Sequence, residues 1–333
     1  MLHFPEQVSE ARGRYAPSPT GLLHVGSART ALAAWLSVRA AAGTFVMRIE
    51  DLDVPRVVPG MAQAILDDLT WLGLDWDEGP RRGGDSGPYR QSERSMHYEA
   101  ALDRLHARAC LFPCRLSRKD LRHLATAPHG TDGLRPYPAA LRPHPLDLGW
   151  FEAFRDGTLP DAALRFRVDD RPVTFTDRVY GALTEQVDRV VGDFVLKRRD
   201  GLYAYQLAVV VDDLLMGINE VVRGEDLLAS TARQIQLIDA LGGSRPAYAH
   251  VPLVVNAEGK KLSKRDQGLT LRSLREAGLR PEALVGYLAF SLGLQPQPVP
   301  CSAAALIPHF AWDRVARDPW RLPPDLVDTL RGG

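Results

Sequence analysis

The stretch that most constrains the fold is 14–27, which reads R-Y-A-P-S-P-T-G-L-L-H-V-G-S. Its middle holds three breakers of regular structure, Pro17, Pro19 and Gly21. A short strand is expected before them, and the apolar run that follows has helical spacing as far as Gly43. A strand, a tight turn and a helix in this order are typical of α/β domains.

The turn delivers His24, Gly26 and Ser27 to the start of the expected helix. A helix N-terminus carries free N–H groups and a partial positive charge, which favour an anion such as phosphate. The same residues also fit a simpler interpretation, in which His24 only caps the helix. The stretch alone does not decide between the two.

Length and composition limit the number of domains and the class of protein. With 333 residues the chain has room for about two domains. Lys plus Arg and Asp plus Glu both number 41, so no overall basic field indicates nucleic acid, although a local patch is compatible with this balance. Three cysteines do not make a disulfide framework, and no apolar run reaches membrane-spanning length. We therefore expect a cytoplasmic protein without membrane contact.

Hydrophobic spacing predicts the other elements. Residues 110–150 are rich in Pro, His and Arg and are interpreted as an insertion rather than a sheet element. Everything after residue 266 is expected to be helical. Strands are predicted at 45–49, 166–168, 173–175, 193–196, 203–211 and 219–222, and helices at 59–72, 93–109 and 231–241.

Two further segments carry charge at positions that suit ligands. Glu50 follows the strand 45–49, and carboxylates at the C-terminal end of a strand lie where open α/β sheets bind ligands; a solvated loop is the alternative. The segment K-K-L-S-K-R at 260–265 holds three of the chain's few lysines. A flexible lysine there can neutralise a transferring phosphate, or the segment can be a basic surface patch.

Together these motifs resemble a known family. The pair H-V-G-S and K-L-S-K-R is similar to the two signatures of class I aminoacyl-tRNA synthetases. The segments R-Y-A-P-S-P-T-G, R-I-E-D-L-D, Y-x-L-A-V-V-V-D-D and V-R-G-E-D-L resemble the catalytic domain of glutamyl-tRNA synthetases, from about residue 12 to 270. The short chain and the segment D-F-V-L-K-R-R-D-G-L-Y-A-Y resemble the truncated members of that family, the glutamyl-Q tRNA(Asp) synthetases.

The resemblance implies an α/β fold with a class I, Rossmann-type parallel sheet, an inserted α+β subdomain and a small C-terminal helical subdomain. The catalytic domain is expected at 12–105 and 193–255, and the inserted, acceptor-binding-like subdomain at 106–192. Residues 256–333 are expected to hold the K-L-S-K-R loop and a helical, stem-contact-like part, with no anticodon-binding domain.

The resemblance also implies roles for residues. His24 and Lys264 are expected to be catalytic. Guanidinium groups suit the two carboxylates of glutamate, and a carboxylate suits its ammonium, so the residue types agree with the implied glutamate site. For Arg223 the alternative is a structural ion pair with Glu225 or Asp226. The implied glutamate-binding residues are Arg14, Ala16, Ser18, Glu50, Tyr205 and Arg223, and the implied ATP-binding residues are His24, Gly26, Ser27, Lys261, Ser263 and Lys264.

The implied function is activation of L-glutamate by ATP and Mg²⁺ without tRNA, followed by transfer of glutamate to queuosine in tRNA(Asp). A monomer is expected. Two other functions stay open at this point: a truncated glutamyl-tRNA synthetase that charges tRNA(Glu), and a non-catalytic RNA-binding relative.

One departure concerns zinc. Truncated members of the family often bind it through C-x-C followed by Y-x-x-x-C, and the corresponding positions here are Phe112, Cys114, Tyr137 and Leu141. Only Cys114 and Tyr137 keep ligand types, and structural zinc takes four ligands. We expect no zinc, with packing by Phe112 and Leu141 in its place. A different set remains an alternative: Cys110, Cys114, His123 and His129.

Overall fold

The computed structural model describes residues 3–5, 9–116, 120, 136–144, 146–147, 149–256, 258–260, 269–323 and 325–331. Five residues of the expected sites therefore lie outside the described residues: His123, His129, Lys261, Ser263 and Lys264.

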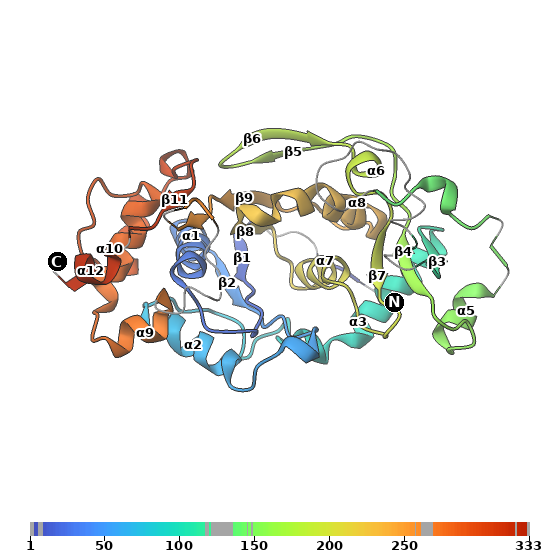
Figure 1. The fold of residues 1–333 in the computed structure, drawn as a ribbon, viewed down its shortest axis with the longest axis horizontal. Helices are drawn as coiled ribbons and strands as arrows, with labels where there is room; N and C mark the ends of the chain where they lie inside the picture. The colour runs from blue at the N-terminus through green and yellow to red at the C-terminus, as the bar shows by residue number, and fades with distance from the viewer. Residues whose placement is uncertain are drawn as a thin grey trace.

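A six-stranded sheet forms the centre of the molecule (Figure 1). Its strand order is β2-β1-β8-β9-β5-β6, and every neighbouring pair is parallel except β5 and β6, which form an antiparallel hairpin. The expected α/β fold is confirmed. The strands are β1 (Arg12–Tyr15), β2 (Thr44–Met47), β5 (Val173–Asp177), β6 (Gly181–Glu185), β8 (Glu220–Gly224) and β9 (Ala247–Val251).

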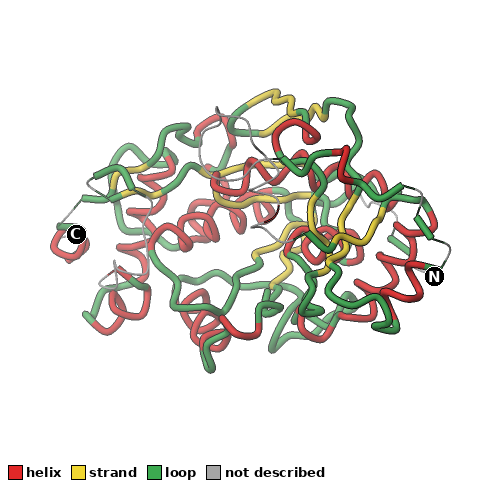
Figure 2. Tube along the Cα trace, turned by 45° about the vertical axis from the view of Figure 1, so that its right-hand side comes forward, coloured by secondary structure: helices red, strands yellow, loops and turns green. Residues whose placement is uncertain are grey.

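Both faces of this sheet are covered. In β2 the side chains of Phe45 and Met47 join one hydrophobic core and Val46 joins another, and in β8 Val221 and Val222 divide in the same way. This alternation follows from the two-residue period of a strand. Figure 2 shows helices in red on both sides of the central yellow strands.

Helices supply the two cores. α1 packs on β1 and β8 and is itself covered by α10, while α3, α7 and α8 pack together in the other core. Glycines in the left-handed conformation end α8 at Gly242 (φ +70°) and α10 at Gly293 (φ +85°). The larger helices are α1 (Val25–Ala40), α2 (Met61–Trp71), α3 (Ser95–Ala107), α7 (Tyr205–Leu215), α8 (Thr231–Leu241) and α10 (Pro281–Leu292).

The strand predicted at 203–211 is wrong, because this segment forms the helix α7. The helix is buried on nearly all sides, from Leu207 to Leu214, so its sequence shows no polar face. A continuous apolar run does not distinguish a buried strand from a buried helix. The other strands and helices predicted above have counterparts in the structure, and the limits of α8 match the prediction residue for residue.

A three-stranded antiparallel sheet, in the order β3-β4-β7, lies at the opposite end of the molecule from the C-terminal helices (Figure 1). The expectation that 110–150 holds no sheet element is wrong, since β3 pairs with β4 over four residues. β5 and β6, from the range expected for the insertion, extend the six-stranded sheet, whereas β7, from the range expected for the catalytic domain, belongs to the three-stranded sheet. These strands are β3 (Leu111–Cys114), β4 (Ala163–Phe166) and β7 (Phe194–Lys197).

The C-terminal part is helical, as expected, apart from the short parallel pair β10 (Val254–Val255) and β11 (Trp320–Arg321). The remaining helices are short and lie in this part or beside the inserted sheet: α5 (Trp150–Arg155), α6 (Val187–Val190), α9 (Leu271–Glu276), α11 (Ala303–Leu306) and α12 (Leu326–Arg331).

Candidate active site

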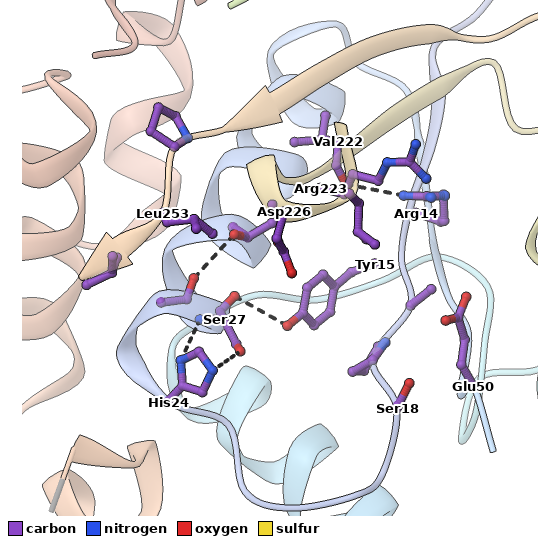
Figure 3. Close-up of a pocket in the computed structure, with 18 of the residues that line it drawn as sticks. Arg14, Tyr15, Ser18, His24, Ser27, Glu50, Val222, Arg223, Asp226 and Leu253 are labelled. Carbon is purple, nitrogen blue, oxygen red and sulfur yellow. Dashed lines mark hydrogen bonds between the residues drawn. The ribbon is translucent and has the colours of Figure 1, made fainter. Parts of the chain in front are cut away.

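A pocket of about 380 Å³ opens at the C-terminal ends of β1 and β8, beside the start of α1. This edge of a parallel sheet is where open α/β folds bind ligands. Figure 3 shows Arg14 and Glu50 on one side of the pocket and His24 and Ser27 on the other. The described residues of the expected glutamate and ATP sites all line it: Arg14, Ala16, Ser18, His24, Gly26, Ser27, Glu50, Tyr205 and Arg223.

His24 is the N-cap of α1. Its Nδ1 accepts a hydrogen bond from the backbone N–H of Ser27 at 3.2 Å, and its Nε2 lies 3.2 Å from the Ser27 hydroxyl. A Cβ at Gly26 would meet the His24 ring at 3.2 Å, so glycine permits the ring to lie against the helix start. In this structure His24 therefore caps the helix, as the simpler interpretation expects, and it also lines the pocket.

Arg14 is held in place by a buried carboxylate. Its Nε donates to both oxygens of Asp213, at 3.1 and 3.2 Å, and its Nη1 donates to the Val222 carbonyl at 3.2 Å. Within the described residues, these hydrogen bonds leave Nη2 of Arg14 unused. Asp213 thus aims the guanidinium while leaving donors for a ligand.

A second arginine, Arg48, links this pair to Glu50. Its side chain is fully buried, and it donates to Asp213 at 2.8 Å through Nη1 and to Glu50 at 3.2 Å through Nη2. Burial raises the pKa of Glu50, although Arg48 and Arg14 partly oppose this. Burial likewise acts to raise the pKa of Asp213, but Arg14 and Arg48 outweigh it and hold that pKa below its usual value.

Arg223 is the last but one residue of β8, and its side chain lines the pocket. Its Nη1 donates to Gln234 at 2.7 Å, its Nη2 donates to the Thr231 hydroxyl at 3.0 Å, and its Nε donates to His250 at 3.0 Å. The alternative ion pair with Glu225 or Asp226 is not among the ion pairs of the described residues, and these neutral partners orient the guanidinium instead.

Tyr205 completes the wall as the first residue of α7. Burial raises the pKa of its phenol, and Glu50 adds to this effect. The ring therefore stays neutral and can offer its hydroxyl as a hydrogen-bond donor.

Comparison with known proteins agrees with this geometry. The family described as tRNA synthetases class I (E and Q), catalytic domain, matches residues 10–310. A glutamyl-Q tRNA(Asp) synthetase of Symbiobacterium thermophilum is 48% identical over 323 residues, which cover 96% of this chain and 98% of that protein. The one from Nitratidesulfovibrio vulgaris is 44% identical and covers 97% of this chain and 98% of its own length. The chain belongs to the glutamyl-Q tRNA(Asp) synthetase family.

It is accordingly a ligase of the aminoacyl-tRNA synthetase type. Among solved structures, a glutamate tRNA ligase from Elizabethkingia meningosepticum in complex with its amino acid superposes with a TM-score of 0.83 at 31% identity. The match covers 96% of this chain and 68% of that one. Within the described ranges, none of the helices has the length and apolar character that crossing a membrane requires.

Several residues of the pocket and its support are not singled out by the sequence motifs. Asp213 is the last letter of Y-x-L-A-V-V-V-D-D and Arg48 the first letter of R-I-E-D-L-D, but the sequence assigns neither of them a role. A buried arginine in the strand that ends at Glu50 is a usable signal, because a buried charge needs an opposite partner. The others have no such signal: Thr30, Thr231, Gln234 and His250.

The four positions aligned with the family's zinc ligands do come together. Phe112, Cys114 and Tyr137 are buried in one small cluster, with Leu141 packed against it. The Tyr137 hydroxyl donates to the Leu141 carbonyl at 2.9 Å and lies 3.8 Å from the Cys114 sulfur. In the described part of the chain, no three metal-ligating side chains form a group that could hold a metal ion. The absence of zinc itself stays a prediction.

Proposed function

We propose that this enzyme activates L-glutamate with ATP, without needing tRNA, and transfers it to queuosine at the wobble position of tRNA(Asp). The observation that carries the first half is the pocket itself. It combines two guanidinium groups and one carboxylate with the N-terminus of a long helix.

The amino-acid half of the pocket matches glutamate in charge. Glutamate carries two carboxylates and one ammonium, and the pocket offers Arg14, Arg223 and Glu50 to them. We assign Tyr205 to a wall and a hydroxyl donor, and Ala16 and Ser18 to the backbone and hydroxyl contacts beside Arg14. Because Asp213 and Gln234 already hold the two guanidinium groups, little side-chain freedom is lost when the ligand binds.

The nucleotide half is the start of α1. Free N–H groups there, with Gly26, Ser27 and the His24 ring, would face the phosphates, so His24 would exchange its capping hydrogen bond for a phosphate oxygen. We assign Lys261, Ser263 and Lys264 to the opposite side of the nucleotide.

Mg²⁺ fits this site as a companion of ATP. The described lining holds two carboxylates, Glu50 and Asp226, and Glu50 is already engaged by Arg48. A site with so few protein ligands suits Mg²⁺, because this ion keeps several of its waters and is held mainly by substrate phosphates. Asp226 would lie near the ion. When bound, it supplies positive charge to the phosphate oxygens.

The proposed chemistry has two steps. A glutamate carboxylate oxygen attacks the α-phosphorus of ATP, and pyrophosphate leaves with the electrons of the broken P–O bond. A hydroxyl of the acceptor then attacks the glutamyl carbonyl, loses its proton and displaces AMP. In the first step the enzyme acts mainly by positioning and charge stabilisation, which requires no proton transfer from His24 or Lys264.

The acceptor is proposed from the relatives. The glutamyl-Q tRNA(Asp) synthetases of Symbiobacterium thermophilum and Nitratidesulfovibrio vulgaris match over 98% of their own length. Queuosine carries a cyclopentenediol whose hydroxyls can play the part of a ribose hydroxyl. A second candidate acceptor, tRNA(Glu), is favoured by the likeness to a glutamate tRNA ligase over 96% of this chain.

A transfer assay with labelled glutamate tests the proposal. Three RNAs are compared: tRNA(Asp) with queuosine, the same tRNA(Asp) without queuosine, and tRNA(Glu). We expect label on the first alone, and pyrophosphate exchange with glutamate and ATP before any RNA is added. Label on tRNA(Glu) would establish the second candidate, and no exchange without RNA would refute the tRNA-independent step.

A further inference from the structure

Behind Arg223 lies a row of buried side chains that the proposed chemistry does not use. Arg223 Nε donates to His250 Nε2 at 3.0 Å, and His250 Nδ1 lies 2.7 Å from Asp177 Oδ2. The side chains of His250 and Asp177 are fully buried, and Arg223 is 5% exposed. His250 and Asp177 are not part of the described pocket lining, so they reach the pocket only through Arg223.

The order of donors fixes the protonation of the imidazole. An arginine only donates, so His250 Nε2 must accept, and the proton of a neutral ring then lies on Nδ1 and points to Asp177. Burial lowers the pKa of His250, although the hydrogen bond to Asp177 opposes this, so the ring is neutral at physiological pH. The hydrogen bond to this neutral ring therefore orients the Arg223 guanidinium without adding a charge beside it.

Asp177 is itself held firmly at the end of β5. Its Oδ1 accepts from the backbone N–H groups of Val179 and Tyr180, at 2.9 and 3.0 Å, which leaves Oδ2 for His250. The three side chains come from adjacent parallel strands, β5, β9 and β8. Their spacing is therefore set by the sheet and not by a loop.

The remaining contacts of Arg223 explain why its direction matters. A guanidinium has five N–H groups, and His250, Thr231 and Gln234 take three of them. Two donors stay available for a ligand carboxylate. Nε lies nearest the backbone end of the group, so its partner decides how the plane turns and where these two donors point.

We infer that His250, held by Asp177, is a positioning residue for glutamate: it fixes the Arg223 guanidinium in the plane that receives a glutamate carboxylate. This inference rests on the proposed function and adds to it two residues outside the pocket. A purely structural role of His250 in packing β8 against β9 is the competing explanation.

Two substitutions separate these explanations. His250→Asn places an amide where Nδ1 lies, so it keeps the contact to Asp177 and loses the one to Arg223. His250→Gln places its side-chain oxygen near the position of Nε2, so it keeps an acceptor for Arg223 and loses the contact to Asp177. His309→Asn at an exposed site is the matched control. Pyrophosphate exchange gives kcat and both KM values, calorimetry gives the Kd of L-glutamate, and circular dichroism follows folding.

For His250→Asn we expect KM and Kd for glutamate to rise about tenfold, equivalent to about 1.4 kcal/mol. The KM for ATP should stay within about twofold, because only one substrate loses an oriented partner. For His250→Gln, glutamate KM should stay within about threefold of wild type. Equal losses in both variants, or an equal rise in the ATP KM, would overturn the positioning role.

If His250→Asn fails to fold, His250→Gln still decides, since a folded His250→Gln enzyme with a tenfold higher glutamate KM refutes the inference. Failure of the proposed function is separate, because it would be seen as wild-type enzyme that catalyses no glutamate-dependent exchange.

Discussion

Replacing Asp213 with asparagine should damage both stability and glutamate binding. The Asp213 carboxylate accepts from Arg14 at 3.1 and 3.2 Å and from Arg48 at 2.8 Å, and both arginines are buried. At an effective dielectric constant of about 20, two charges about 4 Å apart attract by about 4 kcal/mol. Arg48 keeps Glu50 and Asp212 as partners, and asparagine keeps one acceptor oxygen. We therefore expect Asp213→Asn to lower the free energy of unfolding by about 3 kcal/mol.

Urea denaturation at pH 7 measures this loss, and pyrophosphate exchange should show a raised KM for glutamate, because Arg14 is no longer aimed. The pKa of Asp213 is depressed in the folded state, so its contribution exists above the unfolded pKa and fades as the pH falls through the folded value. The difference between variant and wild type should shrink in acid. Asp239→Asn, which breaks an exposed ion pair with Arg245, is the control and should cost less than about 1 kcal/mol. If Asp213→Asn costs no more than the control, Arg14 and Arg48 do not depend on this carboxylate.

Three further outcomes are expected. Lys264→Ala should lower kcat of pyrophosphate exchange while leaving the Kd of glutamate unchanged, and a matching rise in that Kd would contradict a role confined to the phosphates. Burial raises the pKa of Asp68 to about 6 against the opposing charge of Arg275, and in the described chain its oxygens have no hydrogen-bond partner. The folded-state pKa is raised, so Asp68 lowers the stability of the folded protein once the pH rises from about 4 to about 6 and the carboxylate ionises. Asp68→Asn should therefore be more stable than wild type at pH 7 and lose that advantage near pH 4. Thermal unfolding at the two pH values measures the difference. Protein purified without added zinc should contain less than one equivalent by metal analysis, and EDTA should leave its thermal midpoint unchanged, because Phe112 and Leu141 pack where two of the four ligands would be needed.

The sequence predicted a turn followed by a helix correctly, because Pro17, Pro19 and Gly21 exclude regular structure and the apolar run after them has helical spacing. The residues expected to bind glutamate and ATP line one pocket where the structure describes them, and their roles remain predictions. Sequence reasoning failed for α7, where burial on all sides removed the polar face that identifies a helix. It also could not find Thr231, Gln234 or His250, because their importance lies in contacts between distant parts of the chain.

The contact between Arg14 and Asp213 joins residues 199 positions apart in the chain. β1 gains its second neighbour, β8, only after the whole inserted region has been synthesised. A nascent chain that has emerged to residue 200 therefore has the helix start and Glu50 but neither Asp213 nor Arg223. The entropy cost of closing a loop grows only slowly with the length of the loop. Even so, proteins with many contacts between distant residues fold more slowly than proteins with mostly local contacts. We therefore expect the amino-acid pocket to form late in folding, and a released fragment that lacks α7 and β8 would have neither Asp213 nor Arg223 with which to bind glutamate.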